Sequence, residues 1–352
     1  MSYRVIQWAT GAMGKTCLRA VIDHPDLELV GLYVYNAKKA GVDAGDIAHR
    51  EKTGVLATRD IDDILALEAD VVIFAPMLQP PYISHDATIM QLLASGKNVI
   101  SINGQSYPVH WGGEHAGKFD TACKSGSSTL LGGGLNPGFI VERIAAAATG
   151  ICTRLDRVKV QEIVHCQAMR SPAYVFDMLG FGADAGSIDP NNRGWAPAEL
   201  LNGLYSEVVA GFVARLGQKL DRVETAHRML PASKDIEIAA GQIRAGTVSH
   251  TQWCWHGIVG GQRLFTLQID WIMETAHLEN PNQPIWQVSV SGDPMVDIRI
   301  DLDRREGDSF KTSPEQYGVA GSVLNSIPAL VNAPPGLMLM PSAPSFQSHM
   351  AP

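Results

Sequence analysis

Residues 3–35, YRVIQWATGAMGKTCLRAVIDHPDLELVGLYVY, decide the fold. Residues 3–9 form a short, mostly apolar run with β-branched members, which predicts a buried strand. Apolar side chains follow at helical spacing over residues 17–22, and the His-Pro-Asp sequence at 24–26 ends that helix. A second apolar run at 27–35 predicts another strand. Together these segments predict the opening βαβ unit of a doubly wound parallel sheet.

The turn between the first strand and the helix predicts a dinucleotide site. Against the pattern G-x-G-x-x-G, residues 9–14 read Ala-Thr-Gly-Ala-Met-Gly, so alanine replaces the first glycine. A glycine at position 11 lets the backbone approach a pyrophosphate, and one at position 14 lets the helix pack close to the strand. We expect the cofactor to contact Thr10, Gly11, Ala12, Met13 and Gly14. The alternative is a tight turn that binds nothing.

The end of the second strand bears on which nicotinamide cofactor binds. Sites for NAD usually place an acid there, about 20 residues past the glycines, to bind the ribose 2′-hydroxyl. This strand instead runs into Asn36, Ala37, Lys38 and Lys39, and the next acid is Asp43. Asn36, Lys38 and Lys39 would attract a 2′-phosphate, so the sequence favours NADP over NAD. Solvated loop lysines are the alternative.

Further segments extend the predicted parallel sheet. A continuous apolar run at 69–75 and predicted strands at 98–102 and 129–131 alternate with helical patterns at 83–94 and 113–124. In such sheets, ligands bind outside the carboxyl ends of the strands. The candidate cofactor contacts at these ends are Ala75, Pro76, Asn103 and Gly104, and residues 132–137 form another ligand-facing turn.

The second half of the chain changes character. Residues 157–165 predict a strand, and runs at 247–257, 264–273, 285–291 and 295–302 predict an antiparallel meander. Alternation puts Trp253 and Trp255 on one face, which could be an exposed dimer interface or a core packed under helices. A final helix is expected over 315–330, and the tail from 337 to 352 is expected to lack regular structure.

Composition bounds the class of protein. A chain of 352 residues suggests two domains. The net charge of −8, without a basic block, argues against nucleic acid and anionic membrane as partners. Five cysteines, none at C-x-x-C spacing, indicate neither a metal site nor a disulfide framework. With no signal pattern and no apolar run of about 18 residues, we expect a cytoplasmic protein.

Four stretches in order carry a family resemblance: GAMGK at 11–15, ELVGLYV at 28–34, VVIFA at 71–75 and GGGLNPGF at 132–139. Together they resemble the dihydrodipicolinate reductase-like oxidoreductases, and within them the 2,4-diaminopentanoate dehydrogenase and native amine dehydrogenase branch. The resemblance implies an α/β fold: an N-terminal Rossmann domain and an α+β substrate and dimerisation domain with an open antiparallel sheet. It also implies a returning final helix and a homodimer. We therefore expect domains at 1–136, completed by 312–352, and at 137–311.

Two departures from the family pattern matter. Dihydrodipicolinate reductases carry paired histidines with a nearby lysine, whereas residues 162–167 hold the single His165. The sequence thus argues against that reaction. Amine-forming relatives place a carboxylate just after the strand at 98–102, but residues 101–108 contain no acid, and Gln105 is the nearest replacement. An amide cannot accept a proton as a carboxylate does, which puts reductive amination in doubt but not hydride transfer.

The chemistry of hydride transfer requires positioning more than reactive side chains. Gln105 and His165 are the candidate catalytic residues, each with a structural role as the alternative. The residues expected to line a mainly apolar substrate pocket are Asn136, Phe139, Met169, Tyr174 and Met178. We expect an NAD(P)-dependent oxidoreductase that acts on a C=N or C=O group of a small molecule, with NADP preferred. The alternative is a non-catalytic NADP(H)-binding sensor.

Overall fold

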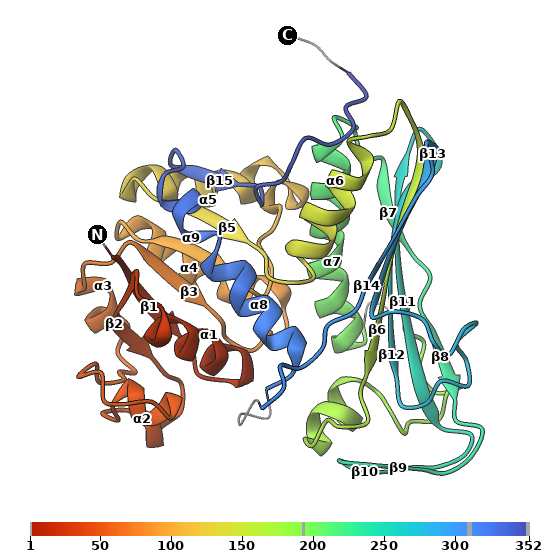
Figure 1. Ribbon diagram of the computed structural model, residues 1–352, viewed down its shortest axis with the longest axis horizontal. Helices are drawn as coiled ribbons and strands as arrows, with labels where there is room; N and C mark the ends of the chain where they lie inside the picture. Colours follow the sequence, from red (N-terminus) through yellow and green to blue (C-terminus); the bar gives the residue numbers. More distant parts are fainter. Residues whose placement is uncertain (1, 192–193, 308–311, 350–352) are drawn as a thin grey trace. The chain divides into compact units, whose positions relative to one another are not determined.

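The computed structural model describes residues 2–191, 194–307 and 312–349. The chain divides into two compact units (Figure 1). Unit 1 comprises residues 1–143 and 303–341, and unit 2 comprises residues 144–302 and 342–352. Residues 342–349 therefore group with unit 2, whereas the sequence pattern assigned all of 312–352 to the first domain.

Unit 1 is built on a six-stranded parallel sheet in the order β15-β5-β4-β3-β1-β2. The strand at 71–74 is buried along its whole length, which explains its continuous apolar sequence. The predicted doubly wound parallel sheet is confirmed. The strands are β1 (Tyr3–Trp8), β2 (Leu27–Tyr33), β3 (Val71–Phe74), β4 (Asn98–Ser101), β5 (Thr129–Gly132) and β15 (Gly336–Met338).

Helices cover both faces of this sheet (Figure 1). On one face, Ile89, Leu92 and Phe119 pack in a single core cluster with the strands. On the other face, Cys17 and Val21 pack with Val323 from the C-terminal part of the chain. The helices are α1 (Ala12–Asp23), α2 (Ala44–Ala48), α3 (Ile61–Ala66), α4 (Asp86–Ala94), α5 (Gly113–Gly126), α8 (Pro314–Leu324) and α9 (Ile327–Val331), with 3₁₀ turns η1 (Ala37–Lys39), η2 (Tyr82–His85) and η3 (Pro108–Trp111).

The C-terminal segment returns to the first unit, as the resemblance implied. α8 packs against α1, and Arg19 donates a hydrogen bond of 3.2 Å to Thr312 Oγ1. The tail departs from its prediction, because β15 adds a parallel strand beside β5. This short strand exists through its pairing with Thr129, Leu130 and Leu131, which no local pattern reveals.

Unit 2 is built on a seven-stranded sheet with the path β14-β13-β6-β12-β11-β7, and β8 also pairs with β11. The predicted meander is corrected in one respect: β6 lies between β12 and β13 and runs parallel to β12, so the sheet is mixed. The strands are β6 (Arg154–His165), β7 (Arg222–Thr225), β8 (Arg228–Pro231), β11 (Val248–Val259), β12 (Gln262–Ile272), β13 (Trp286–Asp293) and β14 (Val296–Ile300), with a separate hairpin of β9 (Ile236–Ile238) and β10 (Gly241–Ile243).

One face of this sheet is covered by α7 (Ala196–Arg215), a helix of 20 residues that the sequence pattern did not predict. Trp253 and Trp255 are fully buried on that face. Trp255 Nε1 donates to Asn202 Oδ1 of α7 at 2.7 Å, and its ring lies 4.5 Å from that of Tyr205. The two tryptophans therefore belong to a packed core, and an exposed aromatic dimer interface is excluded for them.

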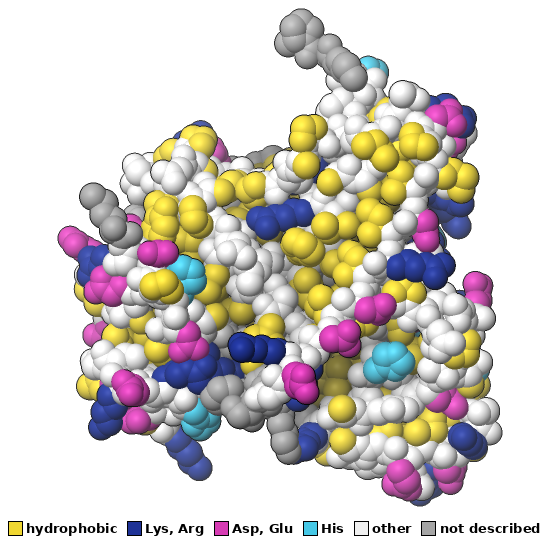
Figure 2. Space-filling model, viewed as in Figure 1, with side chains coloured by type: hydrophobic (Ala, Val, Ile, Leu, Met, Phe, Trp, Pro, Cys, Tyr) yellow, Lys and Arg dark blue, Asp and Glu magenta, His cyan; other side chains and the backbone are white. Residues whose placement is uncertain are grey.

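Three shorter helical segments remain. The π-helical stretch η4 (Phe139–Ala145) spans the point in the sequence where unit 1 ends and unit 2 begins, and α6 (Ala146–Thr149) and the π-helical stretch η5 (Ala173–Met178) belong to unit 2. Within the described residues, no helix is long and apolar enough to cross a membrane. On the face drawn in Figure 2, basic and acidic side chains are interspersed and do not gather into one field of a single sign.

Candidate functional site

The glycine turn after β1 has the geometry of a phosphate site. α1 begins at Ala12 after Gly11, and within the described part of the chain no side chain caps this end. The first amide groups of a helix lack intrahelical partners and carry partial positive charge. Gly11 and Ala12 are exposed, and a Cβ placed on Gly11 would have no described atom within 4 Å. An anion can thus reach the helix start directly.

Close packing behind the turn depends on Gly14. A Cβ at this position would lie 2.2 Å from the carbonyl oxygen of Ala9, so only glycine lets α1 sit this close to the end of β1. Ala9 has a φ of 72°, in the left-handed region that glycine adopts most easily. Buried Gln7 supports this backbone, because its Nε2 donates to the carbonyl oxygens of Trp8 and Ala9 at 3.1 and 3.0 Å.

The structure brings the loop after β2 onto the turn. Lys39 Nζ donates to Thr10 O at 3.0 Å and to Thr10 Oγ1 at 2.8 Å. Burial, together with the charge of nearby Lys15, lowers the pKa of Lys39. Two ammonium groups therefore lie close to the exposed helix start. Lys15 was not among the predicted contacts. Asn36 Oδ1 accepts from the Lys38 amide at 2.9 Å and so shapes the loop, while the Lys38 side chain is exposed.

The nearest acid after β2, Asp43, is committed elsewhere. Its carboxylate accepts hydrogen bonds from the backbone amides of Gly45, Thr53 and Gly54 and from the Thr53 hydroxyl. These bonds, led by that from the Thr53 amide, hold the pKa of Asp43 below its usual range. Asp43 thus stabilises the 43–54 loop as a buried anion, and its oxygens are occupied by protein donors.

The ends of β3 and β4 are tied together by predicted residues. Asn103 Nδ2 donates to the carbonyl oxygen of Pro76. Ala75 and Pro76 are buried, so any contact they make with a ligand involves the backbone. Gly104 has a φ of 136°, and a Cβ there would lie 2.2 Å from Tyr82 Oη. The Gln105 amide in turn donates to Tyr82 Oη at 3.0 Å.

The predicted catalytic Gln105 is buried in a polar cluster. Its Oε1 accepts from Ser101 Oγ at 2.7 Å, and its Nε2 donates to Asp86 Oδ1 at 3.1 Å. On the other side of the carboxyl group, His115 Nε2 lies 3.3 Å from Asp86 Oδ2. Asp86 and Tyr82 were missed, because they lie 19 and 23 residues before Gln105 in the sequence. His115, which follows the stretch at 101–108 closely, was not among the predicted site residues. The acid that contacts this stretch is Asp86, through its hydrogen bond with the Gln105 side chain.

The turn after β5 closes against the same loop. A Cβ on Gly132 would lie 2.3 Å from the carbonyl carbon of Gln105, so the two backbones are in direct contact. The predicted pocket residues Asn136 and Phe139 are half-buried in and after this turn. The Gly138 amide donates to Glu142 Oε2 at 2.6 Å and fixes the start of η4.

The remaining predicted residues lie in unit 2. His165 ends β6, is exposed, and lines a cavity of about 550 Å³ with Gln167, Lys234 and Glu274 among others. Met169 packs against a core cluster that contains Val175. Tyr174 is 41% exposed and Met178 is half-buried, both on η5. The lining of the 550 Å³ cavity does not include these three, so unit 2 does not gather the predicted apolar wall there.

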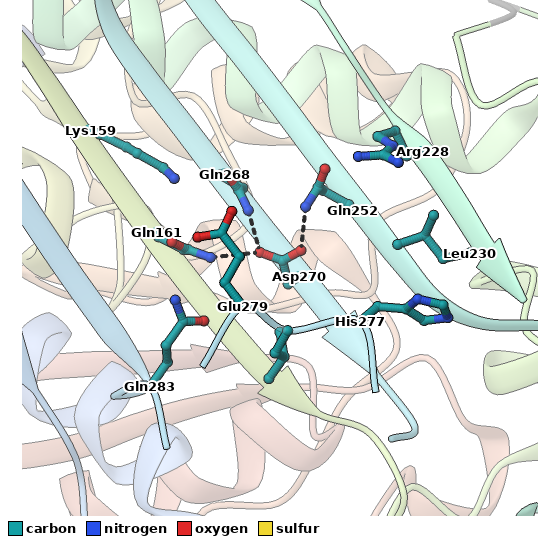
Figure 3. Close-up of a pocket in the computed structure, with 11 residues that line it drawn as sticks. Lys159, Gln161, Arg228, Leu230, Gln252, Gln268, Asp270, His277, Glu279 and Gln283 are labelled. Atoms are coloured by element: carbon teal, nitrogen blue, oxygen red, sulfur yellow. Dashed lines mark hydrogen bonds between the residues drawn. The ribbon is translucent and has the colours of Figure 1, made fainter. Parts of the chain in front are cut away.

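The face of the unit 2 sheet opposite α7 holds a polar pocket of about 330 Å³ (Figure 3). At its centre Asp270, 1% exposed, accepts hydrogen bonds on Oδ1 from His250 and Gln252 and on Oδ2 from Gln161 and Gln268. Burial alone would raise the pKa of Asp270, but the bonds from His250, Gln252 and Gln268 outweigh it and lower the pKa. Lys159, Arg228 and Glu279 add charges of both signs at the rim.

The chain is similar to known proteins, and the matching family model falls within the parallel-sheet unit. Residues 5–75 match the family model described as "Dihydrodipicolinate reductase, N-terminus". The chain is 27% identical to an amine dehydrogenase of Streptomyces virginiae over 94% of this chain and 93% of that protein. It is 26% identical to the 2,4-diaminopentanoate dehydrogenase of Acetoanaerobium sticklandii, over 97% and 93% of the two chains.

A solved structure extends the likeness to the whole fold. The amine dehydrogenase from Mycobacterium smegmatis superposes with a TM-score of 0.77 at 20% identity, over 97% of this chain and 95% of that one. The resemblance to the dihydrodipicolinate reductase-like oxidoreductases, and to their amine dehydrogenase branch, is confirmed. So is the predicted class, an oxidoreductase. Solved structures with this kind of fold include complexes with NAD and with NADP⁺.

Proposed function

We propose that this dihydrodipicolinate reductase-like chain is an NADP(H)-dependent oxidoreductase that transfers a hydride to or from a C=N or C=O group of a small, mainly apolar molecule. The observation that carries the proposal is the open N-terminus of α1 with Lys39 bonded to the turn beside it. A dinucleotide needs both features: amide donors for the pyrophosphate and, for NADP, a cation for the 2′-phosphate.

The residues of unit 1 divide the work of binding. The amides after Gly11 face the pyrophosphate, and Gly14 keeps α1 close enough to present them. Lys39, with Lys15 near it, faces the 2′-phosphate, and Asp43 is too occupied to hold a ribose hydroxyl. When bound, the nicotinamide supplies or accepts the hydride. The loop at 103–106 lies at the carboxyl end of the sheet, where the substrate of such folds is held.

Comparing the dissociation constants of NADPH and NADH by calorimetry tests the choice of cofactor. A 2′-phosphate held by Lys39 gives tighter NADPH binding by about tenfold or more, the worth of one charge-assisted hydrogen bond. Equal affinity, or tighter NADH, contradicts the selection of NADP.

The reacting group is tested by NADPH oxidation against ketones and aldehydes, each with and without ammonia. Oxidation with the carbonyl compound alone assigns C=O reduction, and oxidation only with ammonia assigns C=N reduction. Tight NADPH binding without turnover on any compound favours instead the cofactor sensor considered from the sequence. A Gln105→Glu variant that gains ammonia-dependent turnover shows that an acid at this position serves the C=N reaction.

For the partner, we propose a second copy of the chain on the polar face of the sheet in unit 2. That face carries charges of both signs, from Lys159, Arg228 and Glu279 (Figure 3). Because a twofold interface brings the same face of two copies together, a cation of one copy can pair with the acid of the other. Light scattering tests the proposal: a dimer in the wild type that Lys159→Glu dissociates, with Lys124→Glu on α5 as the control, supports it. A wild-type monomer, or a dimer unaffected by Lys159→Glu, contradicts it.

A further inference from the structure

Asp86, Gln105 and His115 form a chain of side chains that connects the solvent to the loop at the end of β4. His115 is about one-fifth exposed, whereas the Asp86 side chain is 9% exposed. The Gln105 side chain is bonded to Asp86 through Nε2 and to buried Ser101 through Oε1. Three different elements contribute, since Asp86 begins α4, Gln105 follows β4 and His115 lies on α5.

We propose that Asp86 and His115 act as a pH-dependent positioning pair for Gln105 at the candidate hydride-transfer site. The proposal deepens the proposed function and rests on it for its catalytic consequence. Neither Asp86 nor His115 is assigned a direct contact with substrate. Their role is to fix which end of the Gln105 amide faces which neighbour.

The amide of Gln105 has two satisfied orientations, and the proton on Asp86 selects between them. An ionised carboxylate can only accept, so it requires Gln105 Nε2, and Oε1 then accepts from the Ser101 hydroxyl, as observed. A protonated Asp86 can donate to Oε1 instead. The amide then turns over, and its NH₂ group donates to Ser101 Oγ, which also accepts. In either state Gln105 keeps one hydrogen bond to Asp86 and one to Ser101.

The protonation change falls in an accessible range because of burial. Burial raises the pKa of Asp86 to about 6, against a smaller lowering by the bond from Gln105. Burial also lowers the pKa of His115, and the charge of Lys118 adds to this. The ring is therefore largely neutral near pH 7 and serves as a donor to the carboxylate.

Other titratable groups around Asp86 have their own partners. The hydroxyl of Tyr82 on η2 accepts a hydrogen bond from the backbone amide of Gln105. His85 Nε2 donates to Met77 O at 2.9 Å. Lys118 forms an exposed pair with Glu114 at 3.0 Å on α5. His110 on η3 stacks edge-on against Trp111.

The orientation of Gln105 matters because its backbone is held in place. Gln105 has a φ of 55°, its backbone contacts Gly132, and its backbone N–H donates a hydrogen bond to Tyr82. With the backbone fixed, turning the side-chain amide exchanges the positions of its NH₂ group and its oxygen, each of which has capacity for one further hydrogen bond, as a donor or as an acceptor. A carbonyl or imine substrate requires one of these and not the other.

The direct test follows the side-chain amide of Gln105 by nuclear magnetic resonance in the full-length chain, with the signal assigned by its loss in Gln105→Asn. We expect the signal to shift with a midpoint near pH 6, as set by Asp86. The shift should vanish in Asp86→Asn and persist in Asp62→Asn, a matched exposed acid in the first turn of α3. In His115→Phe, whose side chain has no donor for the carboxylate, the midpoint should move upward.

A signal that stays flat between about pH 5 and pH 8 in the wild type, or that titrates equally in Asp86→Asn, overturns the proposal. This result is independent of turnover, so it stands even if no substrate is found. Where turnover is measured, Asp86→Asn should abolish the corresponding limb in the pH profile of kcat/KM while the NADPH dissociation constant changes by less than about threefold. If Asp86→Asn retains that limb of the pH profile, the positioning role is contradicted. If the wild type does not bind NADPH, the proposed function alone is contradicted.

Discussion

The ammonium group of Lys39 donates to both the carbonyl and the hydroxyl oxygen of Thr10, a residue 29 positions earlier in the chain. The contact joins the loop after β2 to the glycine turn after β1. It places a cation beside the open start of α1, where the ribose of a dinucleotide lies in folds of this kind. The choice of cofactor therefore depends on a side chain that also supports the turn.

Lys39→Met should weaken NADPH binding by about tenfold to a hundredfold, because a charge-assisted hydrogen bond contributes about 1.5–3 kcal/mol. NADH binding should change much less, since NADH has no 2′-phosphate. Calorimetry with both cofactors measures the difference, and Lys124→Met, which removes an exposed surface pair with Asp120, is the control. An equal loss for both cofactors would show that Lys39 only supports the turn.

Gly14→Ala should destabilise unit 1 by about 1–3 kcal/mol, because the new methyl group would overlap the carbonyl of Ala9. Gly11→Ala is the matched variant: it meets open space at a φ of −66°, so stability should change by less than about 1 kcal/mol. Urea unfolding compares the two variants. A larger loss of stability in Gly11→Ala than in Gly14→Ala would contradict this role of Gly14 in packing.

Asp86→Asn should change how stability depends on pH. The unfolded carboxyl releases its proton near its usual pKa of 3.8, but the folded one keeps it until about pH 6, so stability falls as pH rises through this window. The asparagine does not titrate. Relative to the wild type, the variant should therefore gain up to about 3 kcal/mol in free energy of unfolding between about pH 4 and pH 8. Parallel pH curves for the two proteins would refute the raised pKa.

Gly104→Ala should lower turnover more than it lowers cofactor affinity. The added Cβ would collide with Tyr82 Oη, and the φ of 136° strains any residue other than glycine. Displacing this loop moves Gln105 and disturbs the predicted cofactor contact at Gly104, but it leaves the α1 turn intact. NADPH affinity should therefore fall by less than kcat, which should fall by about tenfold or more. A fall in NADPH affinity as large as that in kcat would mean that the loop serves the cofactor.

The sequence predicts unit 1 well because its signals are local. Buried parallel strands such as β3 read as continuous apolar runs, and the turn at 9–14 has a fixed spacing. Helix α7 was missed because 14 of its 20 residues are buried, so apolar residues occur on every side and no amphipathic stripe marks it. The place of β6 beside β12 is a pairing of distant segments and leaves no local pattern.

The candidate site shows the same division. Thr10, Gly11 and Gly14 follow from a motif, and Lys39 follows from the chemistry expected at the end of the second strand. Asp86 does not, because it lies 19 residues before Gln105, on a different connection between strand and helix. Only folding brings that acid into contact with the side chain of Gln105.

Hydride transfer itself is tested most directly with NADPH carrying deuterium at C4 of the nicotinamide. The product formed from a ketone or aldehyde, with or without ammonia, is then analysed by mass spectrometry. We predict that the reduced product carries one deuterium at the former C=O or C=N carbon when the label occupies the transferred position. A reduced product without deuterium from either C4 position, or no product from any compound although NADPH binds, would contradict the assignment of this chain as an NADP(H)-dependent oxidoreductase.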